Sequence, residues 1–250
     1  MTVLAKAIIF TILFVVATID AEAVREIPEF LHICQVRDPQ YETCIVNSIN
    51  ILKPYLKEGV PEYNIPSMDP LKLKKLSISP SSLRIQMTDT VAYGASNFDV
   101  VKLKLNIDKL FFVVDVVLPN LFIQGKYDID GKILLLPIHG SGPMNGNFSD
   151  CFGTAKIQGE RFFDENGIEK IRIADFKMKI SVGKGTFKFD NLFNGEQVLG
   201  DLINSSINNN FDLFMMEILP FVEIVLSDVF KQISNNIVQQ FTLEQLFPGL

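Results

Sequence analysis

Residues 189–200 of the chain read FDNLFNGEQVLG. The Asn194-Gly195 dipeptide between apolar residues is typical of a β-hairpin turn. The residues that follow do not alternate as a strand would, so we instead predict that Asn194 is the N-cap of a helix. Gln197 then completes a capping box, and Phe193 and Val198 form a hydrophobic staple around it.

The residues after this start repeat with a helical period. Apolar side chains recur at steps of three or four residues, a pattern that predicts an amphipathic helix. The series is Leu199, Ile203, Ile207, Phe211, Phe214, Ile218, Val222, Val225, Val229, Ile233 and Ile237. A helix of about 40 residues is about 60 Å long, far beyond an ordinary strand. We expect Pro220 to kink it and a sheet to wrap around it.

The preceding residues, 73–193, predict an antiparallel sheet. Apolar residues alternate with polar ones over residues 101–108, which indicates strands with one buried face. The apolar runs 110–118 and 133–138 predict strands covered on both faces. We therefore expect an α+β fold in which a highly curved antiparallel sheet wraps a long C-terminal helix.

Turns and bends in this sheet are predicted from glycine and from breaks in the alternation. Asp130-Gly131 and Asn166-Gly167 are typical hairpin turns. The glycine-rich residues 140–147 indicate a bend or a loop. Ile173 and Phe176 belong to out-of-phase alternations, which indicates a β-bulge between them.

The first 23 residues have the pattern of a secretory signal peptide. Lys6 precedes an apolar run over residues 7–17, and Ala21 and Ala23 form a small-residue cleavage site. Residues 24–250 then form one domain, and no later segment reaches the length of a membrane span without a charge or a proline. We predict a secreted, extracellular protein.

Three cysteines and two sequons fit that compartment. Cys34 and Cys44 predict a disulfide near the mature N-terminus. Cys151 is left over, either as a buried thiol or as an intermolecular link. Asn147 and Asn204 begin sequons and are possible glycosylation sites.

Composition argues against several functions. A formal net charge of −6 gives no electrostatic reason to bind nucleic acid or anionic lipid. The two histidines, His32 and His139, stand in no pattern that pairs a base with a nucleophile, and no metal-ligand spacing occurs. We predict no enzymatic activity, no cofactor and no metal.

Several stretches together resemble the takeout and juvenile hormone binding protein family of insects. They are the signal peptide, the early cysteine pair, GVPEYNIPSMDPL (59–71), LPIHGSG (136–142) and NLFNGEQVLGDLINSSINNNF (191–211). The resemblance implies a single module like those of paired-barrel lipid-binding proteins, with a hydrophobic tunnel for one elongated ligand. Because a fourth cysteine is missing, the chain looks closer to the takeout branch.

Ligand-lining residues are predicted from the apolar excess, which includes 21 phenylalanines and no tryptophan. Six lie on apolar strands or on the helix stripe: Phe112, Phe176, Met178, Phe214, Met215 and Ile218. Tyr127 and Ser141 would contact a polar end group. A helix over residues 41–56 carries Ile49 and Leu52 on its apolar face, and we predict that it covers one mouth of the tunnel.

The sequence therefore predicts a secreted carrier of one small hydrophobic ligand, such as a terpenoid like juvenile hormone or a fatty acid. The alternative is a secreted signalling protein that acts through a protein receptor and needs no ligand. We expect a monomer that does not insert stably into membranes.

Overall fold

The structure is a computed structural model that describes residues 25–78, 83–133 and 136–250. The predicted signal peptide lies outside the described residues. The strands are β1 (Leu71–Ile78), β2 (Leu83–Tyr93), β3 (Asp99–Asn106), β4 (Phe111–Ile133), β5 (Leu136–Phe163) and β6 (Glu169–Phe189). The α-helices are α2 (Tyr41–Glu58), α3 (Gln197–Asn209), α4 (Phe211–Val238) and α5 (Leu243–Leu246), and the 3₁₀ turns are η1 (Pro61–Tyr63), η2 (Ala95–Asn97) and η3 (Phe193–Gly195).

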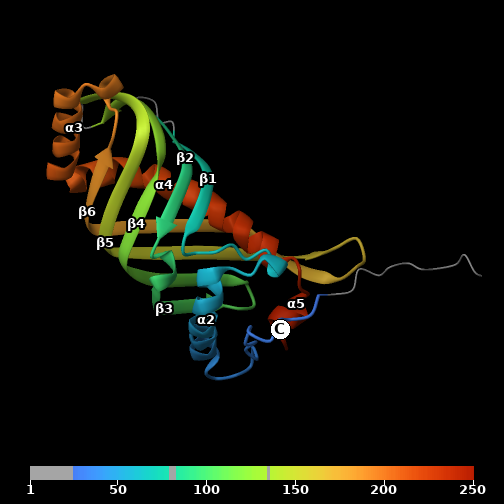
Figure 1. The fold of residues 1–250 in the computed structure, drawn as a ribbon. Coiled ribbons are helices and arrows are strands. Elements are labelled where there is room, and N and C mark those ends of the chain that lie inside the picture. Colours follow the sequence, from blue (N-terminus) through green and yellow to red (C-terminus); the bar gives the residue numbers. More distant parts are fainter. Residues whose placement is uncertain (1–24, 79–82, 134–135) are drawn as a thin grey trace, which may run out of the picture.

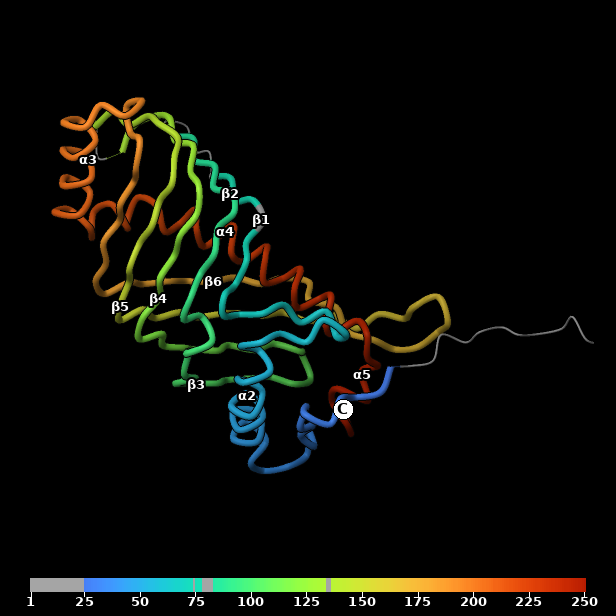
Figure 2. Tube along the Cα trace, in the orientation of Figure 1, coloured from blue at the N-terminus to red at the C-terminus, as the bar shows by residue number. Residues whose placement is uncertain are grey.

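Among the described residues, six antiparallel strands form one strongly curved sheet. The strand order is β1-β2-β4-β5-β6, and β3 pairs with the first part of β4. β4, β5 and β6 are 23, 28 and 21 residues long, and each turns through a sharp bend along its length (Figure 2). The sheet thereby curves around α4, which runs obliquely along it (Figure 1).

The predicted turns are partly wrong. Asp130 and Gly131 lie inside β4, where they pair with His139 and Ile138. Residues 140–147 are not a loop but part of an uninterrupted β5. In both places the two long neighbouring strands pair the backbone of every residue, and this tertiary pairing outweighs the local turn preference.

Two other features of the sheet are confirmed. Asn166 and Gly167 lie in the turn between β5 and β6, where Gly167 has a φ of 74°. The bulge is also present, because Gln158 pairs with Asp175 while Gly159 pairs with Ile173. Ala174 is therefore the extra residue.

The apolar runs differ in how far they are covered. Phe111 to Leu118 are all half-buried, as expected for strands contacted on both faces. In the second run Ile138 is 1% exposed, while its neighbour Pro137 on the other face is exposed, so this end of β5 is covered on one face only.

The start of the C-terminal helix differs from the prediction. Asn194 has a φ of 56° and Gly195 a φ of 86°, so the pair forms a left-handed turn and Asn194 is not an N-cap. Glu196 caps the helix instead, because its Oε2 accepts from the Leu199 N–H at 2.7 Å. The predicted staple is also absent, since Val198 is 73% exposed.

The predicted single helix is two helices. α3 ends at Asn209 and α4 begins at Phe211, with Asn210 between them at φ −120° and ψ 38°. Pro220, where we expected a kink, lies inside α4 on an exposed side. On that side water can solvate the carbonyl that proline leaves without a helical donor.

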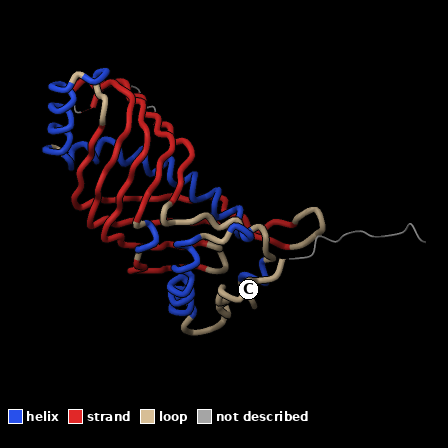
Figure 3. Tube along the Cα trace, in the orientation of Figure 1, coloured by secondary structure: helices blue, strands red, loops and turns tan. Residues whose placement is uncertain are grey.

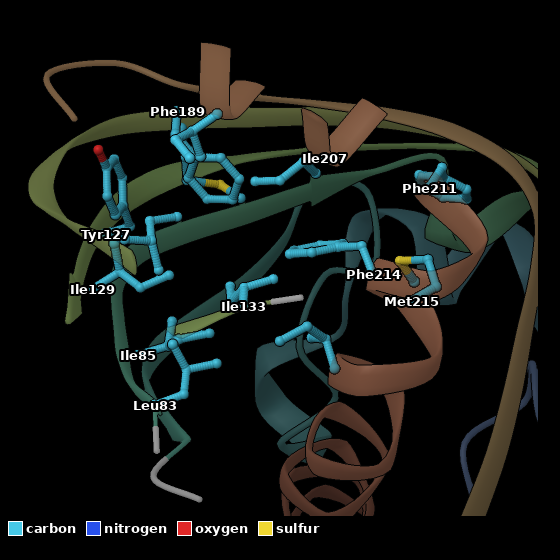
Figure 4. Packing of buried hydrophobic residues seen from close by; sticks show 14 of the residues in the cluster. Leu83, Ile85, Tyr127, Ile129, Ile133, Phe189, Ile207, Phe211, Phe214 and Met215 are labelled. Carbon is cyan, nitrogen blue, oxygen red and sulfur yellow. The ribbon is translucent and has the colours of Figure 1, made fainter. Parts of the chain in front are cut away.

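The main core lies between the upper part of the sheet and the two helices. Phe214 of α4 points toward side chains of β2 and β4, and Ile207 of α3 lies beside Phe189 of β6 (Figure 4). Phe211 of α4 packs instead against Phe148 of β5 and Phe187 of β6. Phenylalanine rings fill much of it. The ring centroids of Phe187 and Phe214 are 5.0 Å apart, and those of Phe148 and Phe187 are also 5.0 Å apart.

The free edge of β6 is covered by polar side chains of α3 and α4. Asn204 accepts from the N–H of Phe189 at 2.9 Å and donates to its carbonyl at 2.9 Å, and Asn208 forms the same pair with Phe187 at 2.8 Å and 2.8 Å. Each amide therefore takes the place of a neighbouring strand residue, which leaves β6 paired along this edge.

The coverage continues along α4 in four-residue steps. Glu223 Oε1 accepts from the Ile180 N–H at 2.9 Å, and Ser227 Oγ from the Met178 N–H at 2.9 Å. Asn235 forms a two-bond pair with Ile173, at 2.7 and 3.0 Å, and Lys231 Nζ donates to the Ala174 carbonyl at the bulge. Residues four apart share one side of a helix, so this polar row sets the position of α4 against β6.

We predict that Asn208→Ala lowers the free energy of unfolding by about 2 kcal/mol, because the partly buried N–H and carbonyl of Phe187 lose their partners. Urea denaturation measures the change. Asn209→Ala is the matched control: this neighbouring asparagine is exposed, and its replacement should change stability by less than about 0.5 kcal/mol. Equal effects of the two substitutions would contradict the role of Asn208 in pairing the β6 edge.

Candidate functional site

The space between the sheet and α4 is closed on two sides. On one side α4 carries the polar row that binds the edge of β6. On the other, Leu226, Val229 and Phe230 pack against a second cluster, the β1 cluster, formed by buried Leu71, Leu73, Ala92 and Ala95. α4 therefore joins the two outer strands of the curved sheet, with the inner faces of the middle strands beneath it (Figure 3).

Many apolar side chains in this space are only half-buried. They pack against the main core but keep part of their surface accessible. Those on the sheet are Met87, Leu118, Leu121, Ile123, Val182 and Phe187, and those on α4 are Leu219, Phe221, Val222 and Val225. The inner surface is thus apolar and incompletely filled by the protein's own side chains.

Two of the hollows among the described residues are well defined. One is a void of about 10 Å³ between β4, β5 and α3, large enough for about one water molecule. The other is an open surface cleft of about 510 Å³ lined by Val36 and residues 39–43 and 105–108. Neither is a channel beside α4, so the tunnel remains a prediction.

The predicted lining residues fall into two groups. Phe214 and Met215 (Figure 4) and also Ile218 are buried in the main core. Phe112, Phe176 and Met178 are half-buried in the other half of the sheet. There Phe176 stacks on Phe230 of α4 at 6.1 Å and Phe112 on Phe247 of the C-terminal segment at 6.1 Å.

Each of the two residues predicted to contact a polar end group forms a hydrogen bond with the turn that precedes α3. Tyr127 is buried and its hydroxyl donates to the Asp190 carbonyl at 2.7 Å. Burial, with the charge of Asp190, raises the pKa of Tyr127 to about 12. Ser141 is exposed, and its carbonyl accepts from Asn191 at 2.7 Å. Both residues join the sheet to the turn before α3.

Helix α2 covers a different part of the molecule from α4. It lies against β3 and η2 (Figure 2), where Lys53 forms an ion pair with Asp99 at 2.7 Å. Ile49 and Leu52 on α2 are half-buried. The helix itself is confirmed, from Tyr41 to Glu58, and its action as a cover remains a prediction.

The cysteines are arranged as one disulfide and one thiol. Cys34 and Cys44 are bonded to each other, as predicted. His32 lies within 4.8 Å of both sulfurs, but sulfurs bonded to each other offer no thiolate to a metal. Cys151 is free and buried in the main core. Burial, followed by the charge of Asp150, raises the pKa of its thiol, which disfavours the reactive thiolate.

The β1–β2 wall of this space was not among the predicted site residues. Leu71, Leu73 and Ala92 are buried there beneath α4. Their alternation with polar neighbours was available as a signal. The pattern does not say which strand face packs against the C-terminal helix, because that depends on the path of the folded chain.

Comparison with known proteins gives concordant results. Residues 9–248 match the family model described as haemolymph juvenile hormone binding protein. The circadian clock-controlled protein daywake of Drosophila melanogaster is 24% identical over 233 residues, or 88% of each chain. Daywake of Drosophila yakuba is 23% identical over 239 residues, or 90% of each. The crystal structure of takeout 1 from Epiphyas postvittana superposes with a TM-score of 0.74 at 22% identity, covering 86% of this chain and 99% of that one.

The superposition confirms the predicted fold class, a curved antiparallel sheet with a long C-terminal helix. In the described part of the chain, no helix has both the length and the apolar character needed to cross a membrane.

The asparagine side chains of the two sequons differ in whether the fold already uses them in hydrogen bonds. Asn204 Nδ2 donates to the carbonyls of Phe189 and Gly200, at 2.9 and 3.1 Å, and attachment of a sugar would remove one of these two N–H groups. Asn147 is exposed on β5. We therefore predict that the protein made in a eukaryotic secretory pathway carries a glycan at Asn147 and none at Asn204.

Mass spectrometry of the secreted protein tests this assignment. Asn147→Gln should remove the glycan mass, and Asn204→Gln should leave it unchanged. A glycopeptide containing Asn204 from natively folded protein would show the assignment to be wrong.

Proposed function

The chain belongs to the takeout and haemolymph juvenile hormone binding protein family, and from this premise we propose that it is a secreted carrier of one small hydrophobic ligand. The ligand occupies the space between α4 and the inner face of the sheet. The family is one of binding proteins, and we propose no catalytic step for this member.

One observation carries the proposal: apolar side chains on the facing surfaces of α4 and the sheet remain half-buried. Val222 and Val225 on α4, and Leu121 and Ile123 on β4, pack against the main core and still have accessible surface. Apolar surface in an interior is stabilised by contact with an apolar partner rather than with water. A ligand that fills the space provides that contact.

The energetics suit a neutral, largely apolar molecule. Burial of an isoprenoid or acyl chain of about 12–16 carbons gains on the order of 10 kcal/mol, at about 0.8 kcal/mol for each methylene. The costs of association and ordering reduce this gain to a micromolar or nanomolar dissociation constant. A terpenoid such as juvenile hormone, or a fatty acid, fits this class, and no ion pair with the ligand is required.

Secretion is part of the same proposal. The Cys34–Cys44 disulfide is of a kind that persists in oxidising compartments. The pattern of residues 1–23 predicts export through the secretory pathway. We propose that the mature protein acts as a monomer in extracellular fluid.

A second candidate function is supported by a different surface. Leu213, Met216 and Ile224 of α4 are 54, 73 and 61% exposed and lie on one side of the helix with Pro220. Exposed apolar stripes of this kind often mark protein contacts. The alternative is a secreted signalling protein that binds a protein receptor through this stripe without an obligatory ligand.

Native mass spectrometry of protein purified from secreting cells distinguishes the two functions. A carrier should retain an apolar small molecule in one-to-one ratio, and solvent extraction should release it. Protein that emerges empty, and that binds no fluorescent fatty-acid analogue after delipidation, would favour the receptor-binding alternative.

Val225→Phe tests the interior directly. Val225 faces the main core from α4, whereas its neighbour Ile224 is 61% exposed. We predict that Val225→Phe weakens binding of the fatty-acid analogue at least tenfold, because the larger ring takes space that the ligand uses. Ile224→Phe is the matched control and should leave the affinity for the analogue unchanged.

Thermal unfolding of the ligand-free variants decides between an open and a filled interior. An open interior accepts the phenyl ring with little change in stability. A fully packed interior would instead lose about 1–3 kcal/mol through overpacking, and that result would contradict the proposed ligand space.

A further inference from the structure

Thr90 on β2 has a buried hydroxyl group without a protein partner. The side chain is 2% exposed, and its Oγ1 makes no hydrogen bond within the described residues. Buried hydroxyl groups nearly always have a partner, because leaving one unpaired destabilises the folded state. This oxygen therefore needs a partner that is not among the surrounding protein groups.

The hydroxyl lies on the inner face of the sheet. Thr90 is paired with Leu73 of β1, and directly paired residues place their side chains on the same face. Leu73 is buried in the β1 cluster, against which Leu226, Val229 and Phe230 of α4 pack. Thr90 therefore points into the space between the sheet and α4.

A β-bulge and a glycine make room for this hydroxyl. The register of β2 against β4 shifts between Thr88 and Val91, so that Asp89 and Thr90 together lie opposite Gly125. Asp89 has a φ of 52°, as the bent backbone requires. Thr90 Oγ1 would lie 3.1 Å from a Cβ atom added to Gly125. A side chain at position 125 would thus crowd the hydroxyl on the inner face.

Apolar side chains lie beside Thr90 on the inner face, among them its cross-strand partner Leu73. Ile123, two residues from Gly125 on β4, is half-buried and packs against both the main core and the β1 cluster. Thr90 is thus located where these two apolar regions meet. Valine has nearly the same shape and an equal preference for strands, so neither packing nor strand formation requires a hydroxyl here.

Asp128 on β4 is a contrasting case. Its Oδ1 also lacks a hydrogen bond of good geometry, but Arg84 Nη1 lies 2.8 Å away. That carboxylate has a charged partner on the outer part of the sheet. Thr90 has neither a charged partner nor a hydrogen bond among the described residues, so its hydroxyl is an unpaired polar group on the inner face.

We infer that Thr90 is the polar contact for the bound ligand, and that its hydroxyl forms a hydrogen bond with an oxygen-bearing group on an otherwise apolar molecule. A hydroxyl group both donates and accepts, so esters, carboxylic acids, ketones and alcohols all qualify. The ligand class is therefore an oxygenated terpenoid or acyl chain rather than a plain hydrocarbon. This inference rests on the proposed carrier function.

Two probes of equal chain length test it with the delipidated mature protein. Methyl palmitate carries an ester, and octadecane carries no oxygen. Each competes with the fluorescent hydrocarbon diphenylhexatriene for the interior. Thr90→Val should weaken binding of methyl palmitate about fivefold, the value of one hydrogen bond, and leave octadecane unchanged. Thr90→Ser, which keeps the hydroxyl, should restore the preference for the ester.

Unfolding of the ligand-free proteins supplies an independent readout. Thr90→Val should be at least as stable as the parent, because it removes an unpaired buried hydroxyl. A marked loss of stability would show that the hydroxyl already has a structural partner, such as a buried water, and would overturn the inference. Thr90→Ala provides a second variant without the hydroxyl and should lower the ester preference to the same extent.

The possible failures are distinguishable. If both probes bind and Thr90→Val leaves their ratio unchanged, the role of Thr90 is wrong while the carrier function stands. If neither probe nor diphenylhexatriene binds, the carrier function fails, and the inference about Thr90 fails with it.

Discussion

The structure depends on how the outer edge of β6 is paired. A strand at the end of a sheet exposes N–H and carbonyl groups, and a helix has no free backbone donors or acceptors to offer it. Here side chains of α3 and α4 supply them: Asn204, Asn208 and Asn235 each bind one residue of β6 through two hydrogen bonds. The row holds α4 at a fixed distance and direction beside the sheet.

This placement explains the interior. Because α4 is held at the β6 edge on one side and packs against Leu71 and Leu73 of β1 on the other, it joins the two ends of the curved sheet. The middle strands then face the helix without being in full contact with it. The half-buried side chains on both surfaces follow from this geometry, as does the position of Thr90 within an apolar interior.

The same constraint separates residues that look alike in the sequence. Asn208 binds the β6 edge, whereas Asn209 is exposed, and Asn204 is a sequon residue whose amide is already used by the fold. On α4, Glu223 is buried against β6 while Ile224, the next residue, is exposed. An apolar residue on the outside and a carboxylate on the inside reverse the usual order. The edge of the strand needs polar partners, and no apolar cluster of the described residues covers Ile224 on the outer side of the helix.

The sequence by itself determined the class of the fold: two-residue alternation predicts the sheet, the three- and four-residue steps to Ile237 predict the helical region, and Cys34 and Cys44 predict the disulfide. These signals are local, so they survive without knowledge of the partner surfaces. The tertiary structure decided what local signals cannot: that Asp130-Gly131 continues a long strand, that the helical region breaks at Asn210, and that Thr90 lies beneath α4. Each of these depends on which strand or helix lies opposite, and pairing between distant segments outweighs the preference of a dipeptide.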